Sequence, residues 1–96
     1  IGGVISGGAH LAGHLIRAMI DDFQACDVKK AAEAQRRLFR LYRIMGQNGR
    51  VNPVALIKSA MKLLGYDAGL PRMPLLPATD EELKNVKKVM TELGLL

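Results

Sequence analysis

The chain opens with Ile1-Gly2-Gly3-Val4-Ile5-Ser6-Gly7-Gly8, and this stretch decides the fold class that we expect. Its β-branched centre lies between pairs of glycines, which is typical of a short buried strand that ends in a tight turn. A lone strand is unstable, because its backbone N–H and C=O groups need hydrogen-bonding partners. No second strand is predicted in the remaining residues, so we expect the partners to lie in sequence outside this chain.

Four amphipathic helices are predicted after the strand, because apolar residues recur at intervals of three and four. With their caps they cover residues 9–25, 27–45, 52–65 and 79–94. Asp27 is a predicted N-cap, Asn52-Pro53 pairs an N-cap with a proline at the first helical position, and Thr79-Asp80-Glu81-Glu82 is a capping box. Three prolines keep residues 66–78 extended. The chain is therefore expected to be mainly α, with one amino-terminal strand and about four helices.

Length and composition restrict the class of protein further. The 96 residues hold 14 Lys and Arg against 9 Asp and Glu, a formal charge of +5, and leave room for one small domain. A complete (β/α)8 barrel, which takes about 250 residues, is excluded. The single cysteine, Cys26, cannot form an internal disulfide, which predicts a reducing compartment, and no leader or long apolar run is present. We expect a cytoplasmic protein without a membrane partner.

Two short motifs could bind ions, and each has a simpler interpretation. His10 and His14 are four residues apart on one helix, but no third ligand lies near enough in sequence to complete a metal site. Ser6-Gly7-Gly8 precedes a helix N-terminus, where anions bind, yet it lacks the lysine of a phosphate loop and the spacing of a dinucleotide fingerprint. We therefore predict no metal site, and a plain turn before the helix.

A basic stripe is the main argument for a nucleic-acid partner. It consists of Lys29, Arg36, Arg40 and Arg43. The aromatic residues that would stack on bases are scarce, and Glu33 is spaced to pair with Arg36 or Arg37 on the same helix. We expect a solvated, salt-bridged helix face and no nucleic acid.

No catalytic set can be assembled from the chain. Ser6 has His10 nearby in sequence, but no nucleophile-elbow pattern and no orienting acid accompany them. None of the helical lysines has neighbours that predict the desolvated amine of imine chemistry: Lys58, Lys62, Lys84, Lys87 and Lys88. We predict no catalytic residue in this chain.

The order of several motifs resembles the carboxy-terminal part of the dihydrodipicolinate synthase family. These are Gly3-Val4-Ile5-Ser6, then Asn52-Pro53 opening a helix with Lys58-x-Ala60-x-Lys62-x-Leu64-Gly65, then Arg72-Met73-Pro74-Leu75-x-Pro77, and finally Gly94-Leu95-Leu96. The resemblance covers essentially the whole chain but only about the last third of such an enzyme. It implies that residues 1–25 are the last strand and helix of a (β/α)8 barrel, and that residues 26–96 are the carboxy-terminal helical region.

The resemblance also implies a function. Family members are lyases of the pyruvate-dependent class I aldolase superfamily, which hold pyruvate as a Schiff base on a barrel lysine and condense it with an aldehyde. In this subfamily the aldehyde is aspartate semialdehyde, and the product enters lysine and diaminopimelate synthesis. The lysine and the proton-relaying tyrosine lie on earlier strands, so no cofactor and no catalytic residue are expected here. Ile5 alone matches a known site position, against pyruvate. As a bulky branched residue it could equally be part of the packed barrel interior.

Partners follow from the same resemblance: the rest of the barrel, pyruvate and an aldehyde, and further copies of the enzyme, since the family's helical tail packs subunits into tetramers. Two departures, around residues 46–51 and at Ala55, leave the subfamily open. An N-acetylneuraminate lyase or a 2-keto-3-deoxy sugar acid aldolase is the alternative within the superfamily. A free-standing basic helical interaction module is the alternative from another class.

Overall fold

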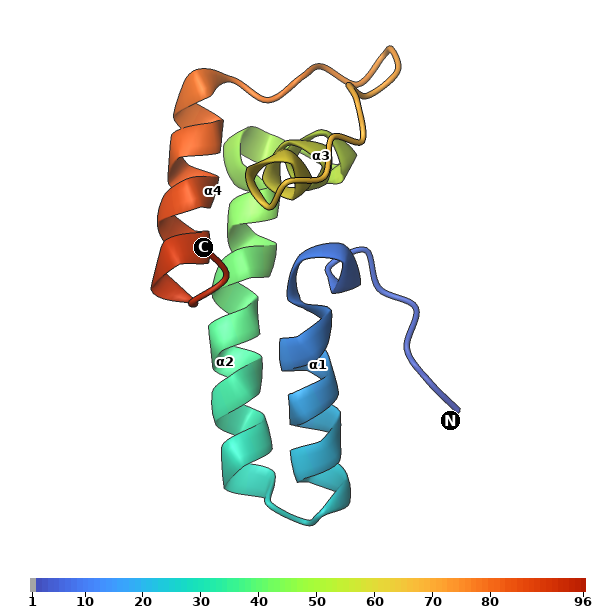
Figure 1. The fold of residues 1–96 in the computed structure, drawn as a ribbon, viewed down its shortest axis with the longest axis vertical. Coiled ribbons are helices and arrows are strands. Elements are labelled where there is room, and N and C mark those ends of the chain that lie inside the picture. The colour runs from blue at the N-terminus through green and yellow to red at the C-terminus, as the bar shows by residue number, and fades with distance from the viewer. Residues whose placement is uncertain (1) are drawn as a thin grey trace.

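The computed structural model describes residues 2–96, which form four α-helices and one 3₁₀ turn (Figure 1). α1 and α2 form an antiparallel hairpin, α4 lies along the second half of α2, and α3 crosses the end of the hairpin. The elements are α1 (Ala9–Gln24), α2 (Val28–Met45), η1 (Gln47–Gly49), α3 (Val54–Leu63) and α4 (Asp80–Glu92). The prediction of a mainly α chain with four helices is confirmed.

The predicted amino-terminal strand is wrong for the part of it that the structure describes. Residues 2–6 form no strand and leave α1 as an arm that runs away from the helices (Figure 1), while Ile1 lies outside the described residues. Val4 and Ile5 are exposed along this arm. The physical reason is that a strand needs a neighbour for its backbone hydrogen bonds. Residues 2–96 supply no such neighbouring strand.

The helix ends follow the capping residues that the sequence predicts. Asp27 Oδ1 accepts a hydrogen bond from Lys30 N at 3.2 Å before α2. Asn52 Oδ1 accepts one from Val54 N at 3.0 Å before α3. Thr79 and Glu82 form a reciprocal capping box that opens α4. The predictions at Asp27 and at Thr79-Glu82 are confirmed, and these caps make α2 and α4 begin where they do. The prediction at Asn52-Pro53 is off by one residue, because Pro53 takes the N-cap position and α3 begins at Val54.

One hydrophobic core joins all four α-helices, and α1 and α2 each contribute three buried residues to it. Leu38 and Leu41 of α2 meet Leu56 of α3 and Met90 of α4, and each of these side chains is almost completely buried. The full set of buried core residues is Leu11, Ala12, Ile16, Leu38, Leu41, Met45, Leu56, Ala60, Val86, Met90 and Leu93. Residues 9–25 and 26–96 thus share a core here, and their assignment to separate parts of a barrel enzyme stays a prediction.

The helices of the described chain are also too short or too polar for a lipid bilayer. Among residues 2–96, none combines the length and the apolar character that crossing a membrane requires.

Candidate functional site

The segment that precedes α1 forms a capped turn. Gly8 N donates a hydrogen bond to Ser6 Oγ at 3.2 Å, and Ala9 N donates to the Ser6 carbonyl at 3.1 Å. In the same way, His10 N donates to the Gly7 carbonyl, and Leu11 N donates to the Gly8 carbonyl. The turn uses these N–H groups within the chain, as expected of a plain turn before a helix, and the absence of an anion site stays a prediction.

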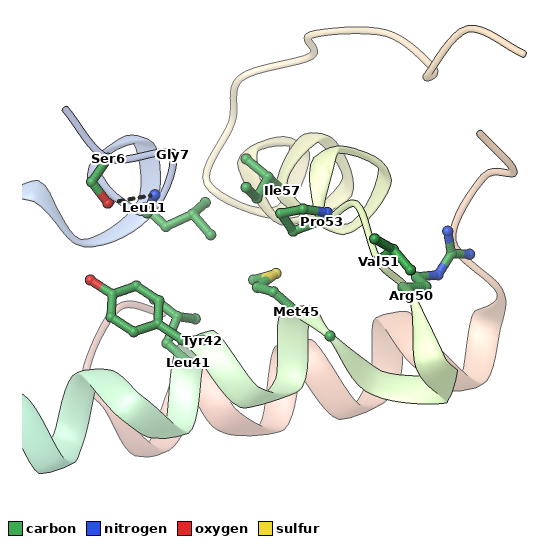
Figure 2. Close-up of a pocket in the computed structure, with 12 residues that line it drawn as sticks. Ser6, Gly7, Leu11, Leu41, Tyr42, Met45, Arg50, Val51, Pro53 and Ile57 are labelled. Carbon is green, nitrogen blue, oxygen red and sulfur yellow. Dashed lines mark hydrogen bonds between the residues drawn. The ribbon is translucent and has the colours of Figure 1, made fainter. Parts of the chain in front are cut away.

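A cavity of about 330 Å³ lies between this turn, α2 and the start of α3 (Figure 2). Leu11, Leu41, Met45 and Ile57 give it apolar walls. Ser6 and Tyr42 lie at one end in Figure 2, and Arg50 and Val51 lie at the other. Its size falls at the lower end of the range of small-molecule sites, whose walls are mostly apolar with a few polar groups.

Beyond the cavity, a buried ion pair joins the loop after α2 to the start of α4. Arg50 Nε lies 2.6 Å from Glu82 Oε2, and Arg50 Nη2 lies 2.9 Å from Glu82 Oε1, so the two groups meet side by side. Glu82 is 2% exposed, and the Arg50 side chain is 17% exposed. Arg50 also donates to the carbonyls of Leu76 and Pro77, both at 2.9 Å. Arg50 therefore ties the loop after η1 to the extended segment and to α4.

The environment of Glu82 stabilises its charged form. Its hydrogen bond with Arg50 is the main cause that lowers the pKa of the carboxyl to about 2, and the Thr79 cap adds to it, while burial opposes the shift. Gln47 extends the network, because its side chain donates to the Glu82 carbonyl at 3.2 Å and accepts from Asn85 at 3.0 Å. The cluster is fully hydrogen-bonded and holds two segments together, which is a structural role.

Sequence reasoning identified Glu82 only as a capping residue and missed Arg50. The two residues are 32 positions apart, and nothing in the local pattern around Arg50 predicts a partner in α4. The capping box was the one available signal, because it fixes the Glu82 side chain at the helix start.

Ile5, the one predicted substrate-binding residue, does not line the cavity. Its side chain is fully exposed on the arm before Ser6. The contact of Ile5 with pyruvate stays a prediction.

The structure also describes the two histidines and the basic stripe. His10 and His14 are exposed, and no group of three metal-ligating side chains comes together in residues 2–96. Arg36 pairs with Glu33 at 3.2 Å, as predicted, and Arg40 pairs with Glu92 of α4. The stripe is partly neutralised, as in a solvated helix face.

The helical lysines named above do not line the cavity. All five are exposed or half-buried. Lys58 donates to the Leu70 carbonyl at 3.4 Å, and Lys62 lies 3.9 Å from Asp67. None is buried among apolar side chains, as the amine of a Schiff-base lysine would be.

Known proteins match the chain along nearly its whole length. The model of the dihydrodipicolinate synthetase family matches residues 1–93. A 4-hydroxy-tetrahydrodipicolinate synthase from Moorella thermoacetica is 42% identical over 94 residues, and one from Synechococcus elongatus is 38% identical over 93 residues. These matches cover 98% and 97% of this chain but 31% and 30% of the relatives, so the chain spans about a third of their length.

The fold agrees with the sequence matches. The crystal structure of a dihydrodipicolinate synthase from Bacillus anthracis superimposes with a TM-score of 0.81 and 32% identity. The match covers 93% of this chain and 30% of that one. From the family match over residues 1–93 and this agreement in fold, the chain belongs to the dihydrodipicolinate synthetase family.

Proposed function

We propose that this chain is the carboxy-terminal portion of a dihydrodipicolinate synthase, a lyase that condenses pyruvate with aspartate semialdehyde in lysine and diaminopimelate synthesis. One observation supports this most strongly: enzymes named 4-hydroxy-tetrahydrodipicolinate synthase match 97–98% of the chain, at 38–42% identity, with about 30% of their own length. The relatives described above share that name, which favours this enzyme over an N-acetylneuraminate lyase or a sugar acid aldolase.

In this proposal, residues 1–25 are the last strand and helix of a (β/α)8 barrel, and residues 26–96 are its helical extension. The exposed arm supports the assignment, because Val4 and Ile5 are β-branched residues that gain burial once neighbouring strands pair with it. Ile5 would then stand at the carboxyl end of its strand, where barrel enzymes build their active sites, and contact pyruvate there.

The chemistry would come from the rest of the barrel. The Schiff-base lysine and the catalytic tyrosine belong to strands outside this chain, which contributes substrate contact through Ile5 and support through its helices. No cofactor and no metal are needed, since a lysine that forms a Schiff base activates pyruvate directly. The chain alone should therefore be inactive.

The proposed partners are the missing barrel and further subunits of a tetramer in the cytoplasm. Large apolar side chains support this, because several remain exposed on α1 and α2 of the chain alone: Phe23, Val28 and Phe39. Large exposed apolar residues are enriched in protein interfaces.

Borohydride trapping tests the proposal. Reduction in the presence of pyruvate should leave the isolated chain unlabelled, because it lacks the Schiff-base lysine. A chimera in which the chain replaces the 94 residues that it matches in the Moorella thermoacetica relative should gain the mass of one reduced pyruvate adduct per subunit. An adduct on a lysine of the isolated chain, or a folded chimera that is never labelled, would overturn the proposal.

A further inference from the structure

Tyr42 of α2 lies against the turn that follows Ile5. A Cβ atom built on Gly8 would lie 2.7 Å from Cε1 of Tyr42, closer than real Cβ atoms approach other groups. It would also lie 3.5 Å from the Tyr42 hydroxyl oxygen. The tyrosine ring therefore occupies the space that a side chain at position 8 would need, at the end of the cavity formed by Ser6 and Tyr42 (Figure 2).

This contact, and not the backbone, explains glycine at position 8. Gly8 has φ −66° and ψ −17°, a right-handed conformation that any residue adopts. Gly65 and Gly94 differ, because their φ values of +97° and +76° favour glycine whatever surrounds them. At position 8, an alanine would require the Tyr42 ring to move.

Tyr42 is also the neighbour from another element that approaches Gly8 most closely. The other side chain near the Gly8 Cβ position is that of Ser6, which belongs to the same turn. Gly7 has one such neighbour, Cδ1 of Ile57, at an ordinary contact distance of 3.5 Å. Upstream of the turn, Val4 and Ile5 are exposed. The contact of Gly8 with Tyr42 is therefore the tighter of the two contacts that the glycines of this turn make with other helices.

We propose that Tyr42 is a positioning residue for Ile5, the residue that contacts pyruvate in the proposed enzyme. Its ring holds the turn at residues 6–8 against α2, and the turn sets the position of Ile5, three residues before Gly8. This inference rests on the proposed function, since Ile5 contacts pyruvate only within the complete enzyme. Tyr42 acts through the turn and touches no substrate, so its loss should weaken pyruvate binding more than it slows bond formation.

The contact itself can be tested in the chain alone. A tyrosine ring this close should shift the Gly8 proton resonances through its ring current. Tyr42→Phe keeps the ring and should keep the Gly8 shift, whereas Tyr42→Leu should move the Gly8 resonances to positions typical of a turn without an aromatic neighbour. Identical Gly8 resonances in the chain and in Tyr42→Leu would overturn the inference at its first step.

Kinetics of the chimera described above test the positioning role. Gly8→Ala should raise the KM for pyruvate about tenfold with a smaller change in kcat, and Tyr42→Leu should raise it several-fold. The double variant should resemble Tyr42→Leu alone, because removing the ring makes room for the alanine. Tyr42→Phe should stay within about twofold of the parent chimera. Tyr66→Leu is the matched control, since Tyr66 is exposed and far from the turn in sequence.

The two proposals fail in different ways. A folded parent chimera that is inactive contradicts the proposed function. An active chimera in which the effects of Gly8→Ala and Tyr42→Leu multiply in the double variant, or in which neither changes the KM for pyruvate, contradicts the positioning role alone. If Gly8→Ala prevents folding, Tyr42→Leu and Tyr42→Phe still decide the question through the KM for pyruvate.

Discussion

The Glu82 carboxylate is buried and accepts hydrogen bonds from three N–H groups. Two belong to Arg50, and the third is the backbone N–H of Thr79, at 3.0 Å. Burying a single charge is costly, and removing one partner of a buried pair leaves the other uncompensated. The pair therefore adds little net stability over an apolar substitute, but the fold cannot tolerate losing one half of it.

Arg50→Ala should accordingly lower the free energy of unfolding by about 3 kcal/mol, because it leaves the Glu82 carboxylate buried without its main partner. Chemical denaturation monitored by circular dichroism measures the loss. Arg36→Ala is the matched control, since it removes an exposed pair with Glu33 and should cost about 0.5 kcal/mol or less. Equal losses in the two variants would show that burial of the Arg50 pair does not matter.

The pH dependence of stability follows from the lowered pKa of Glu82. Folding holds this pKa at about 2, below the ordinary value of 4.5, so the folded chain binds fewer protons than the unfolded chain between these values. The contribution of Glu82 to stability is therefore present above about pH 4.5 and lost as the pH falls toward 2.

Glu82→Gln removes this titration and isolates its effect. The difference in unfolding free energy between the chain and Glu82→Gln should be constant from pH 7 to about pH 5 and should shrink steadily toward pH 2. A difference that does not change with pH would mean that the Glu82 carboxyl has its ordinary pKa in the folded chain.

At the scale of the elements, the helices could be predicted and the amino-terminal strand could not. Apolar spacing and capping residues are local features, and the structure confirms α1 as Ala9–Gln24 and the capping box of α4. A strand depends on partners in space, and none is present in residues 2–96. The Arg50–Glu82 pair was missed for a similar reason, because its two halves come from different elements. Interactions within one element could therefore be predicted from this sequence, and those between elements could not.

The capping box of α4 is a local feature of this kind, and its contribution to stability can be tested. Thr79→Ala should lower the free energy of unfolding by about 1 kcal/mol, because the Glu82 N–H loses the Thr79 hydroxyl that accepts its hydrogen bond at 3.2 Å. Thr79→Ser keeps the hydroxyl and should cost a few tenths of a kcal/mol. Thermal unfolding of the two variants side by side checks the difference. A serine variant as unstable as the alanine variant would contradict the role of the cap.

At the scale of the whole molecule, the chain leaves large apolar side chains exposed, which the proposed barrel and further subunits would cover. Ile5 on the arm, Phe23 on α1 and Phe39 on α2 are all exposed. The isolated chain should therefore self-associate as its concentration rises, which sedimentation velocity would detect.

Replacing Ile5 and Phe39 with aspartate should shift the self-association to higher concentration, because a charged side chain opposes the burial of apolar surface. Lys87→Asp on the exposed side of α4 is the control for the change in net charge. A chain that stays monomeric at all concentrations would instead favour the free-standing interaction module.

The central claim is that this chain forms the carboxy-terminal portion of a working dihydrodipicolinate synthase. It is tested most directly by the rate at which the chimera with the Moorella thermoacetica relative condenses pyruvate with aspartate semialdehyde. The account predicts a kcat/KM within about tenfold of that of the unaltered relative, because the chain would supply the same strand, helix and helical extension. A chimera that folds and assembles but condenses these substrates no faster than the uncatalysed reaction would contradict it.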